Sequence, residues 1–197
     1  MELTELQKKI WNIVKSDLAH EPVAGTDHVE RMTRWCQTLG PAVDADMEVL
    51  VAGALLHDVG VVIDRQKHYA VGRKRAAEIL KEVRFPGEKI DAVLHVLEAH
   101  SRYGGAPDPR TPEAEVGQDA DALEYIGAIG ILRALVRGLS DGSFDGKIDH
   151  FPEYLRSILA KVEETFHTSQ AAEIGRSRLQ YMHRFLERIE QELGFEA

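Results

Sequence analysis

The sequence has few of the features that mark a secreted, membrane-bound or polymer-binding protein. Among 197 residues there is one cysteine, Cys36, which argues against a disulfide framework and favours a reducing, cytoplasmic location. No apolar run approaches the ~20 residues that cross a bilayer, and residues 1–18 lack the apolar core and cleavage site of a signal peptide. The net charge of −9 argues against binding to nucleic acid polymers, but a local basic pocket for a small phosphorylated substrate remains compatible with it.

Strand patterns are equally scarce. No stretch alternates convincingly with β-branched residues, whereas apolar residues recur at helical spacing along most of the chain. Asp27 and Glu30 are spaced as in a capping box, and Gly60 can end a later helix in a left-handed turn. The pattern predicts helices at 2–19, 28–39, 45–59, 68–83, 88–100, 119–138, 152–166 and 169–193, with long loops at 101–115 and 140–149. These elements indicate one all-α domain over residues 1–197.

The stretch GALLHDVG, residues 53–60, places two polar side chains at the end of an apolar segment. Residues 49–56 leave no polar stripe on a helix, so we expect this helix to be central and its C-terminal end to be buried. His57 and Asp58 follow there. Because an unpaired buried carboxylate costs several kcal/mol or more, Asp58 needs a partner. A hydrogen bond to a histidine or a pair with an arginine is the simplest solution.

Other residues of the same chemistry favour a metal ion over a simple pair. His28 opens an earlier predicted helix, and Asp119 and Asp121 open a later one. A divalent cation satisfies two imidazoles and two carboxylates together, which is the usual way in which such buried charge is tolerated. We therefore expect these distant side chains to converge.

In this order, His28, the His57-Asp58 pair and a late aspartate resemble the signature of the HD-domain metal-dependent phosphohydrolases. Four longer segments resemble one subgroup of single-domain bacterial HD hydrolases: EKIDAVLHVLEAHS (88–101), EVGQDADALEYIGAIGILR (115–133), KIDHF (147–151) and RSRLQYMHRFLERIEQEL (176–193). The resemblance runs from about Thr26 to the end. It implies an orthogonal helical bundle with a core at about 26–139, on which C-terminal helices at about 150–194 pack.

The resemblance also implies a ligand set for one divalent ion: His28, His57, Asp58 and one aspartate of DADALE. Helical periodicity does not decide between Asp119 and Asp121. In related HD sequences the ligand precedes a residue of any kind and then a leucine, which favours Asp121 and leaves Asp119 as an N-cap. Such a mixed set of nitrogen and oxygen ligands suits Mn, Fe, Co or Ni, and Mg is an alternative.

Further histidines provide candidate catalytic residues. On a helical wheel of residues 88–100, His100 falls at the edge of the inward face, whereas His95 points the opposite way and is expected to be exposed or structural. His68 lies where some HD proteins place another histidine. His68 or His100 would protonate the leaving group, while Asp58 would hold the metal and orient the attacking water. As an alternative, His68 and His100 would hold a second ion, as in binuclear HD proteins.

Substrate phosphate requires positive charge, and four basic residues are candidates: Arg31, Arg133, Lys74 and Arg102. Arg31 lies one turn after His28 on the same helix face. Lys74 belongs to a basic cluster beside the His-Asp pair, Arg102 begins the long loop, and Arg133 ends GAIGILR as in the resembling proteins.

The reaction implied by the resemblance is metal-assisted hydrolysis of a phosphoester or phosphoanhydride in a small phosphorylated metabolite, above all a nucleotide. Nucleoside triphosphates cleaved to release pyrophosphate are included. Two functions of other classes stay open: a non-catalytic nucleotide-binding or regulatory HD module, and a di-iron HD oxygenase. The C-terminal helices are expected to pack over the bundle or to mediate a homodimer.

Overall fold

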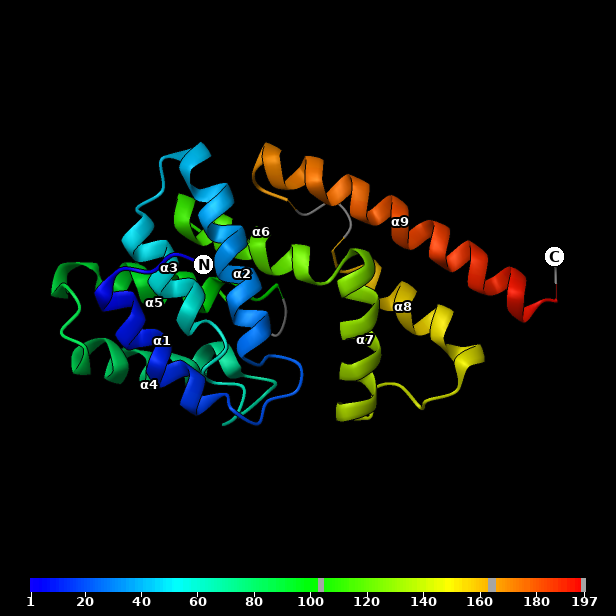
Figure 1. Ribbon diagram of the computed structural model, residues 1–197, viewed down its shortest axis with the longest axis horizontal. Helices are drawn as coiled ribbons and strands as arrows, with labels where there is room; N and C mark the ends of the chain where they lie inside the picture. The colour runs from blue at the N-terminus through cyan, green and yellow to red at the C-terminus, as the bar shows by residue number, and fades with distance from the viewer. Residues whose placement is uncertain (103–104, 163–165, 196–197) are drawn as a thin grey trace. The chain divides into compact units, whose positions relative to one another are not determined.

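The computed structural model describes residues 1–102, 105–162 and 166–195, and these form nine α-helices and no strands (Figure 1). The helices are α1 (Glu5–Asp17), α2 (Thr26–Leu39), α3 (Met47–Leu56), α4 (His68–Glu82), α5 (Ile90–Ala99), α6 (Pro112–Glu124), α7 (Gly127–Asp141), α8 (Phe151–Leu159) and α9 (Ser169–Leu193). The all-α class predicted from the sequence is confirmed. The chain divides into two compact units, Met1–Asp121 and Ala122–Ala197. The assignment of residues 1–197 to one domain stays a prediction.

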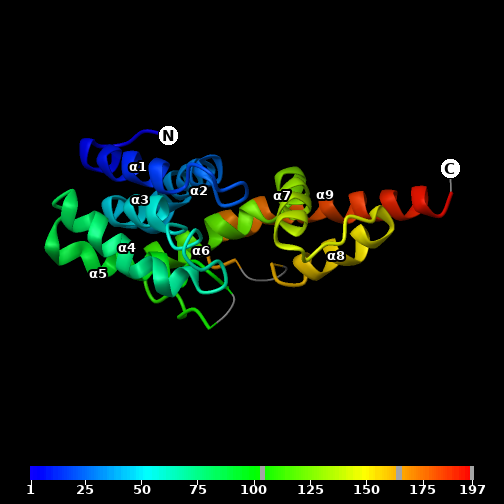
Figure 2. The same ribbon diagram turned by 90° about the horizontal axis from the view of Figure 1, so that it is seen from below.

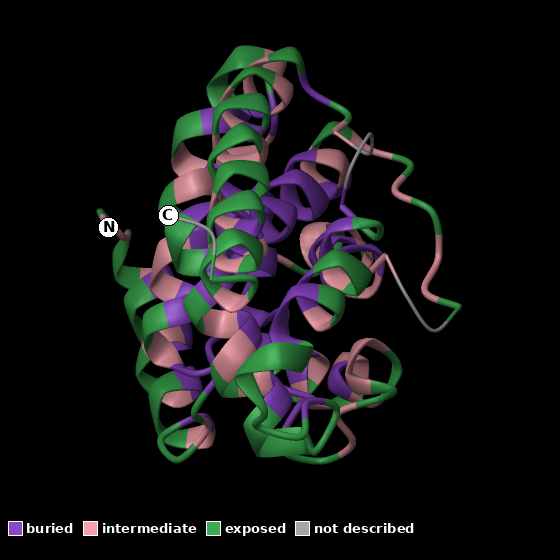
Figure 3. Ribbon diagram, turned by 90° about the vertical axis from the view of Figure 1, so that its right-hand side faces the viewer, coloured by how far each residue is buried: buried purple, intermediate pink, exposed green. Residues whose placement is uncertain are grey.

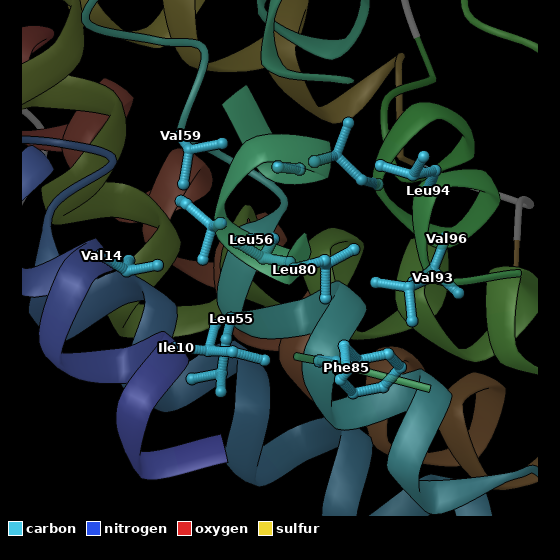
Figure 4. Packing of buried hydrophobic residues seen from close by; sticks show 14 of the residues in the cluster. Ile10, Val14, Leu55, Leu56, Val59, Leu80, Phe85, Val93, Leu94 and Val96 are labelled. Carbon is cyan, nitrogen blue, oxygen red and sulfur yellow. The ribbon is translucent and has the colours of Figure 1, made fainter. Parts of the chain in front are cut away.

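The first unit is built around α3. All residues at 49–56 are buried, because α3 contacts α1, α2 and α5. Figure 2 shows α4 and α5 side by side, in agreement with their contacts. Figure 4 shows how side chains of α1, α3, α4 and α5 pack together, among them Ile10, Leu55 and Leu80. Each such side chain stabilises the fold by about 1.5–3 kcal/mol on full burial, so this core holds the polar C-terminal end of α3 inside the unit.

The predicted helix at 119–138 is wrong, because this range contains the end of α6 and most of α7. Helix α6 begins at Pro112, inside the predicted loop 101–115, of which residues 103–104 lie outside the described residues. The hydroxyl of Thr111 accepts a hydrogen bond from the backbone N–H of Ala114 at 3.2 Å. A threonine cap followed by proline at the first helical position is a start signal that the sequence does contain.

The chain turns between α6 and α7 at Gly127, the first residue of α7. Its φ of +76° is in the left-handed region, which glycine adopts without the steric cost paid by other residues. A Cβ at Gly130 would lie 2.3 Å from the carbonyl oxygen of Tyr125, so the first turn of α7 packs directly on the residue that follows α6. Two glycines therefore make this turn. Helical periodicity missed it because apolar spacing continues through the turn.

The second unit consists of the last residues of α6 together with α7, α8 and α9. Helix α7 contacts α8 and α9. The buried face of α7 consists mostly of glycine and alanine residues. The opposite face carries four large aliphatic side chains that are 39% to 61% exposed, Ile129, Leu132, Val136 and Leu139. Figure 3 shows buried and exposed positions alternating along the helices. Helix α8 ends at Leu159, earlier than the predicted 152–166, whose residues 163–165 lie outside the described ones.

None of the helices in the described part of the chain combines the length and apolar character needed to cross a membrane.

Candidate metal centre

Six polar side chains from different helices meet among the described residues of the first unit. They are His28 in α2, His57 and Asp58 directly after α3, His68 at the start of α4, His100 directly after α5, and Asp121 in α6. Five of them are buried, and His68 keeps 17% of its side chain exposed. Helix packing therefore brings together residues that span almost a hundred positions of the sequence.

The first half of this cluster contains His28, His57 and Asp121. The Nε2 atoms of His28 and His57 lie 3.1 Å apart. One oxygen of Asp58, Oδ2, lies 3.0 Å from Nε2 of His57 and 3.5 Å from Nε2 of His28. Oδ1 of Asp121 lies 3.4 Å from Nε2 of His28. Nε2 of His28 thus lies within 3.5 Å of two carboxylates, and Nε2 of His57 lies beside the same oxygen of Asp58.

The second half contains His68 and His100. Their Nε2 atoms lie 3.0 Å apart. The other oxygen of Asp58, Oδ1, lies 3.6 Å from Nε2 of His68 and 3.7 Å from Nε2 of His100. Asp58 therefore stands between two pairs of histidines, with one oxygen toward each pair.

Hydrogen bonds at the far side of three rings fix which nitrogen faces the cluster. Nδ1 of His57 donates to the carbonyl oxygen of Ala54 at 2.8 Å, and Nδ1 of His68 donates to that of Arg65 at 3.0 Å. Nδ1 of His100 donates to the carbonyl of Leu97. In a neutral ring the Nε2 atom then carries a lone pair and no hydrogen. The bare Nε2 atoms of His68 and His100 then direct lone pairs at each other over 3.0 Å, which is repulsive. A cation between them removes that repulsion, and metal-binding histidines usually donate their other N–H in this way.

The electrostatics of the cluster keep its carboxylates ionised. Burial works to raise the pKa of Asp58, but the neighbouring His57 and His28 outweigh it and hold that pKa well below its usual range. Burial likewise opposes ionisation of Asp121, and the hydrogen bond and charge of His28 nevertheless lower its pKa. Burial, with the nearby His57 and His68, lowers the pKa of His100 to about 4. His100 is therefore a neutral imidazole at pH 7.

Asp119 is not a helix N-cap, contrary to the expectation from the sequence. It lies in the middle of α6, because that helix begins seven residues earlier at Pro112. Its side chain is fully buried, and Oδ1 accepts a hydrogen bond from Nη2 of Arg102 at 3.3 Å. Its neighbour Asp121 is the aspartate beside His28.

The four basic residues predicted to bind substrate have different surroundings. Arg31 donates to Asp27 at 2.9 Å on the surface of α2, and Arg102 is paired with the buried Asp119. Lys74 is exposed on α4. In the second unit, Arg133 donates to the backbone carbonyl of Glu124 at 3.1 Å. Their roles stay predictions.

Two other residues have structural surroundings. Nε2 of His95 accepts a hydrogen bond from the backbone N–H of Arg110 at 3.0 Å, so this ring ties α5 to the segment before α6. Cys36 is fully buried, and burial raises the pKa of its thiol, which keeps it protonated and unsuited to bind a metal. For His95 this agrees with the expectation from the sequence that the residue is exposed or structural.

Two residues near the cluster escaped the sequence reasoning. Arg65 supplies the carbonyl that orients His68, and its guanidinium binds Glu21 at 2.6 Å. In the sequence, the only feature that could have indicated these two residues is that each precedes a candidate histidine.

Gly60 was expected to adopt a left-handed conformation, but it is not among the glycines with positive φ in the described residues. It is needed instead because a Cβ there would lie 2.1 Å from the carbonyl oxygen of His68.

Comparison with known proteins agrees with this geometry. The family model of the HD domain matches residues 25–126, which include all six residues of the cluster. YpgQ of Bacillus subtilis (strain 168) is 28% identical over 202 aligned residues, which cover 97% of this chain and 95% of YpgQ. The crystal structure of YpgQ in complex with ADP has a TM-score of 0.78 at 23% identity and covers 95% of both chains.

Two further relatives carry functional names. An HD-superfamily hydrolase from Bacillus thuringiensis has a TM-score of 0.74 at 25% identity, covering 96% of this chain and 97% of that one. The 3'-5' exoribonuclease YhaM of Listeria innocua is 25% identical over 150 residues, which are 66% of this chain and 47% of YhaM. Since the matched model spans more than half of the chain and all six residues of the cluster, this protein belongs to the HD-domain family.

Proposed function

We propose that this protein is a metal-dependent phosphohydrolase that cleaves a phosphoester or phosphoanhydride of a small phosphorylated metabolite, with nucleotides as the substrate class. The observation that carries the proposal is Asp58, which lies between two pairs of histidines and turns one oxygen toward each. Membership of the HD-domain family and the ADP complex of YpgQ support hydrolysis and a nucleotide substrate.

In the proposed enzyme, His28, His57, Asp58 and Asp121 hold a divalent ion. A set of neutral imidazoles and carboxylates suits Mn, Fe, Co or Ni, with Mg as an alternative. When bound, such an ion lowers the pKa of a coordinated water toward about 7 and polarises a phosphoryl oxygen. Asp58, ionised at neutral pH, accepts hydrogen bonds and so helps to orient the attacking water.

His68 and His100 have two alternative roles. As a general acid, either one must carry a proton at working pH. Burial lowers the pKa of His100 to about 4, which argues against this role for His100. As ligands, both need bare Nε2 atoms, which their Nδ1 hydrogen bonds to Arg65 and Leu97 favour. We therefore favour a second ion held by Asp58, His68 and His100, and the metal content per chain decides between the roles.

Phosphate binding is assigned most readily to Arg31. Its present partner, Asp27, is a surface carboxylate with 72% of its side chain exposed, and such pairs contribute at most about 1 kcal/mol. A substrate phosphate can therefore replace Asp27 at small cost. Arg102 is bound to the fully buried Asp119, and breaking a buried ion pair costs far more than breaking a surface one. Lys74 is exposed and available for a supporting role.

The test is a panel of nucleoside mono-, di- and triphosphates and simple phosphoesters, each with Mn, Mg, Co and Ni, in which phosphate and pyrophosphate are measured separately. A short RNA belongs in the panel because YhaM is named an exoribonuclease. We expect metal-dependent release from at least one nucleotide and none from His57→Ala protein.

Other outcomes of the panel would replace this proposal. Nucleotide binding with metal but without turnover would indicate a regulatory module. Turnover that requires oxygen, with two irons per chain, would indicate an oxygenase. Degradation of RNA alone would move the substrate class from small nucleotides to polymers.

A further inference from the structure

Two helices that carry ligand histidines near their first residues are each preceded by a non-helical segment. His28 is the third residue of α2, and His68 is the first residue of α4. The segments that lead into them therefore help to decide where these two rings stand. One ion pair joins the two segments.

Glu21 organises the segment before α2. Its Oε1 accepts hydrogen bonds from the backbone N–H groups of Val23 at 3.0 Å and Ala24 at 3.2 Å. The chain then turns so tightly that a Cβ at Gly25 would lie 2.2 Å from the carbonyl oxygen of Glu21. Gly25 is the N-cap position of α2. The carboxylate thus closes the turn from which α2 and His28 start.

Arg65 links this turn to the segment before α4. Its Nη2 donates to Oε2 of Glu21 at 2.6 Å, and the side chain of Glu21 is only 7% exposed. The carbonyl oxygen of the same residue accepts the hydrogen bond from Nδ1 of His68. One residue therefore contacts the base of α2 with its side chain and orients the imidazole of His68 with its backbone.

The segment between α3 and α4 is also held in place by contacts that do not involve the ion pair. A Cβ at Gly60 would lie 2.1 Å from the carbonyl oxygen of His68 and 2.7 Å from the nitrogen of Gly72, so the backbone at residue 60 lies directly against α4. Near the other end, Oδ1 of Asp64 accepts hydrogen bonds from the N–H groups of Gln66 and Lys67. With both ends held, Arg65 has a defined place from which to fix His68.

We infer that Arg65 and Glu21 are positioning residues, whose ion pair sets the place of His68 relative to Asp58 and to the base of α2. The inference rests on the proposed metal-binding function, because it gives the pair a role in holding the metal ligand His68. Outer-shell partners of ligating histidines typically change metal affinity by about 10–100-fold when removed.

Calorimetric titration of the metal-free protein with Mn²⁺ tests this inference without depending on turnover. The variants are Arg65→Gln, Glu21→Gln, the double variant and Arg65→Lys, compared with wild type and with His68→Ala. We expect Arg65→Gln and Glu21→Gln each to weaken Mn²⁺ binding at the position that His68→Ala removes by about tenfold or more. The double variant should be no worse than either single one, and Arg65→Lys should restore part of the affinity.

The surface pair of Arg34 and Glu30 provides a matched control. Its atoms also lie 2.6 Å apart, but both side chains are largely exposed, by 59% and 40%, and neither contacts the cluster. Arg34→Gln and Glu30→Gln should leave Mn²⁺ binding unchanged. Thermal melting of every variant shows that the affinities compare folded proteins.

Wild-type Mn²⁺ affinities in Arg65→Gln and Glu21→Gln would overturn the inference. So would an equal loss at every bound ion, because a general loosening of the fold would explain that. If wild type binds Mn²⁺ but hydrolyses nothing, the proposed function fails while the titration still judges the ion pair.

Discussion

The two halves of the ligand cluster differ in what holds them. His28 and His57 are 1% and 0% exposed and belong to α2 and to the buried end of α3. His68 keeps 17% of its side chain exposed and follows the segment at 59–67. His100 directly follows the last residue of α5, at the start of a loop. Helix packing therefore places the first half, while the second half also depends on the segments beside it.

This difference predicts a ranking of the metal positions. A site built from packed helices is preorganised, because its ligands have little freedom to lose when an ion binds. In the proposed enzyme the first half also has four ligands, His28, His57, Asp58 and Asp121, against three for the second. We expect the first half to bind its ion more tightly, and the variants below test that order.

Asp58→Ala should have the largest effect, because both halves share this carboxylate. We expect loss of metal uptake at both positions and no detectable turnover, measured by metal analysis after dialysis and by the nucleotide panel. Asp58→Asn keeps the volume of the side chain and separates loss of charge from failure to fold. Normal metal content in either variant would remove the cluster from consideration as the metal centre.

His28→Ala and His68→Ala should separate the halves. His28→Ala removes a donor from the better-held half, so we expect loss of the tight Mn²⁺ position and of turnover. His68→Ala should retain one tightly bound ion and lose most of its turnover. The number of ions per chain, counted by metal analysis, checks both. Equal losses in the two variants would contradict the proposed ranking.

Asp121→Asn and Asp119→Asn test which aspartate of α6 is the ligand. Asp121→Asn should weaken the tight position by at least about tenfold, because Asp121 is the carboxylate beside His28. Asp119→Asn instead takes the charge partner from Arg102, so we expect a loss of about 3 kcal/mol in unfolding free energy. Chemical denaturation and Mn²⁺ titration of both variants measure the two effects. The reverse pattern would assign the ligand to Asp119.

Glu21→Gln should change the stability of the protein in a pH-dependent way. Burial opposes ionisation of Glu21, but Arg65 and the two backbone N–H groups outweigh it and lower the pKa of the carboxyl. A lowered pKa in the folded state stabilises the fold above the unfolded value of about 4.3 and loses that effect as pH falls further. Denaturation at pH 7 should show Glu21→Gln to be the less stable protein. The difference from wild type should shrink between pH 5 and 3, and a constant difference would contradict this account.

His95→Ala should have the smallest effect on function. Its ring holds the backbone of Arg110 and contacts none of the proposed ligands through a described hydrogen bond. We expect turnover within a few-fold of wild type and a modest loss of stability, of about 1 kcal/mol for one hydrogen bond. Steady-state kinetics and thermal melting are the measurements. A collapse of turnover comparable to that of His28→Ala would place His95 in the active site.

The sequence was sufficient for the parts of this protein that follow from local patterns. The apolar run at 49–56 predicted a central helix, and every one of these residues is buried. The same run predicted a buried position for His57 and Asp58. The break between α6 and α7 was missed because apolar spacing continues past Gly127, while the backbone turns there with φ of +76°. The start of α6 at Pro112 was missed as well, and Asp119, which lies in the middle of that helix, was therefore assigned to an N-cap.

By itself, the sequence indicated candidate metal ligands, through residue type and through the resemblance to HD-domain proteins, and its periodicity determined that the helix before His57 and Asp58 is buried. Only the tertiary structure decided how they meet. Asp58 turns one oxygen to each pair of histidines, Asp121 rather than Asp119 lies beside His28, and Arg65 joins Glu21. The contacts of Asp58 with His28 and His100, of His28 with Asp121 and of Arg65 with Glu21 connect residues 30 to 93 positions apart. No local pattern encodes the packing that brings such distant residues within 4 Å of each other.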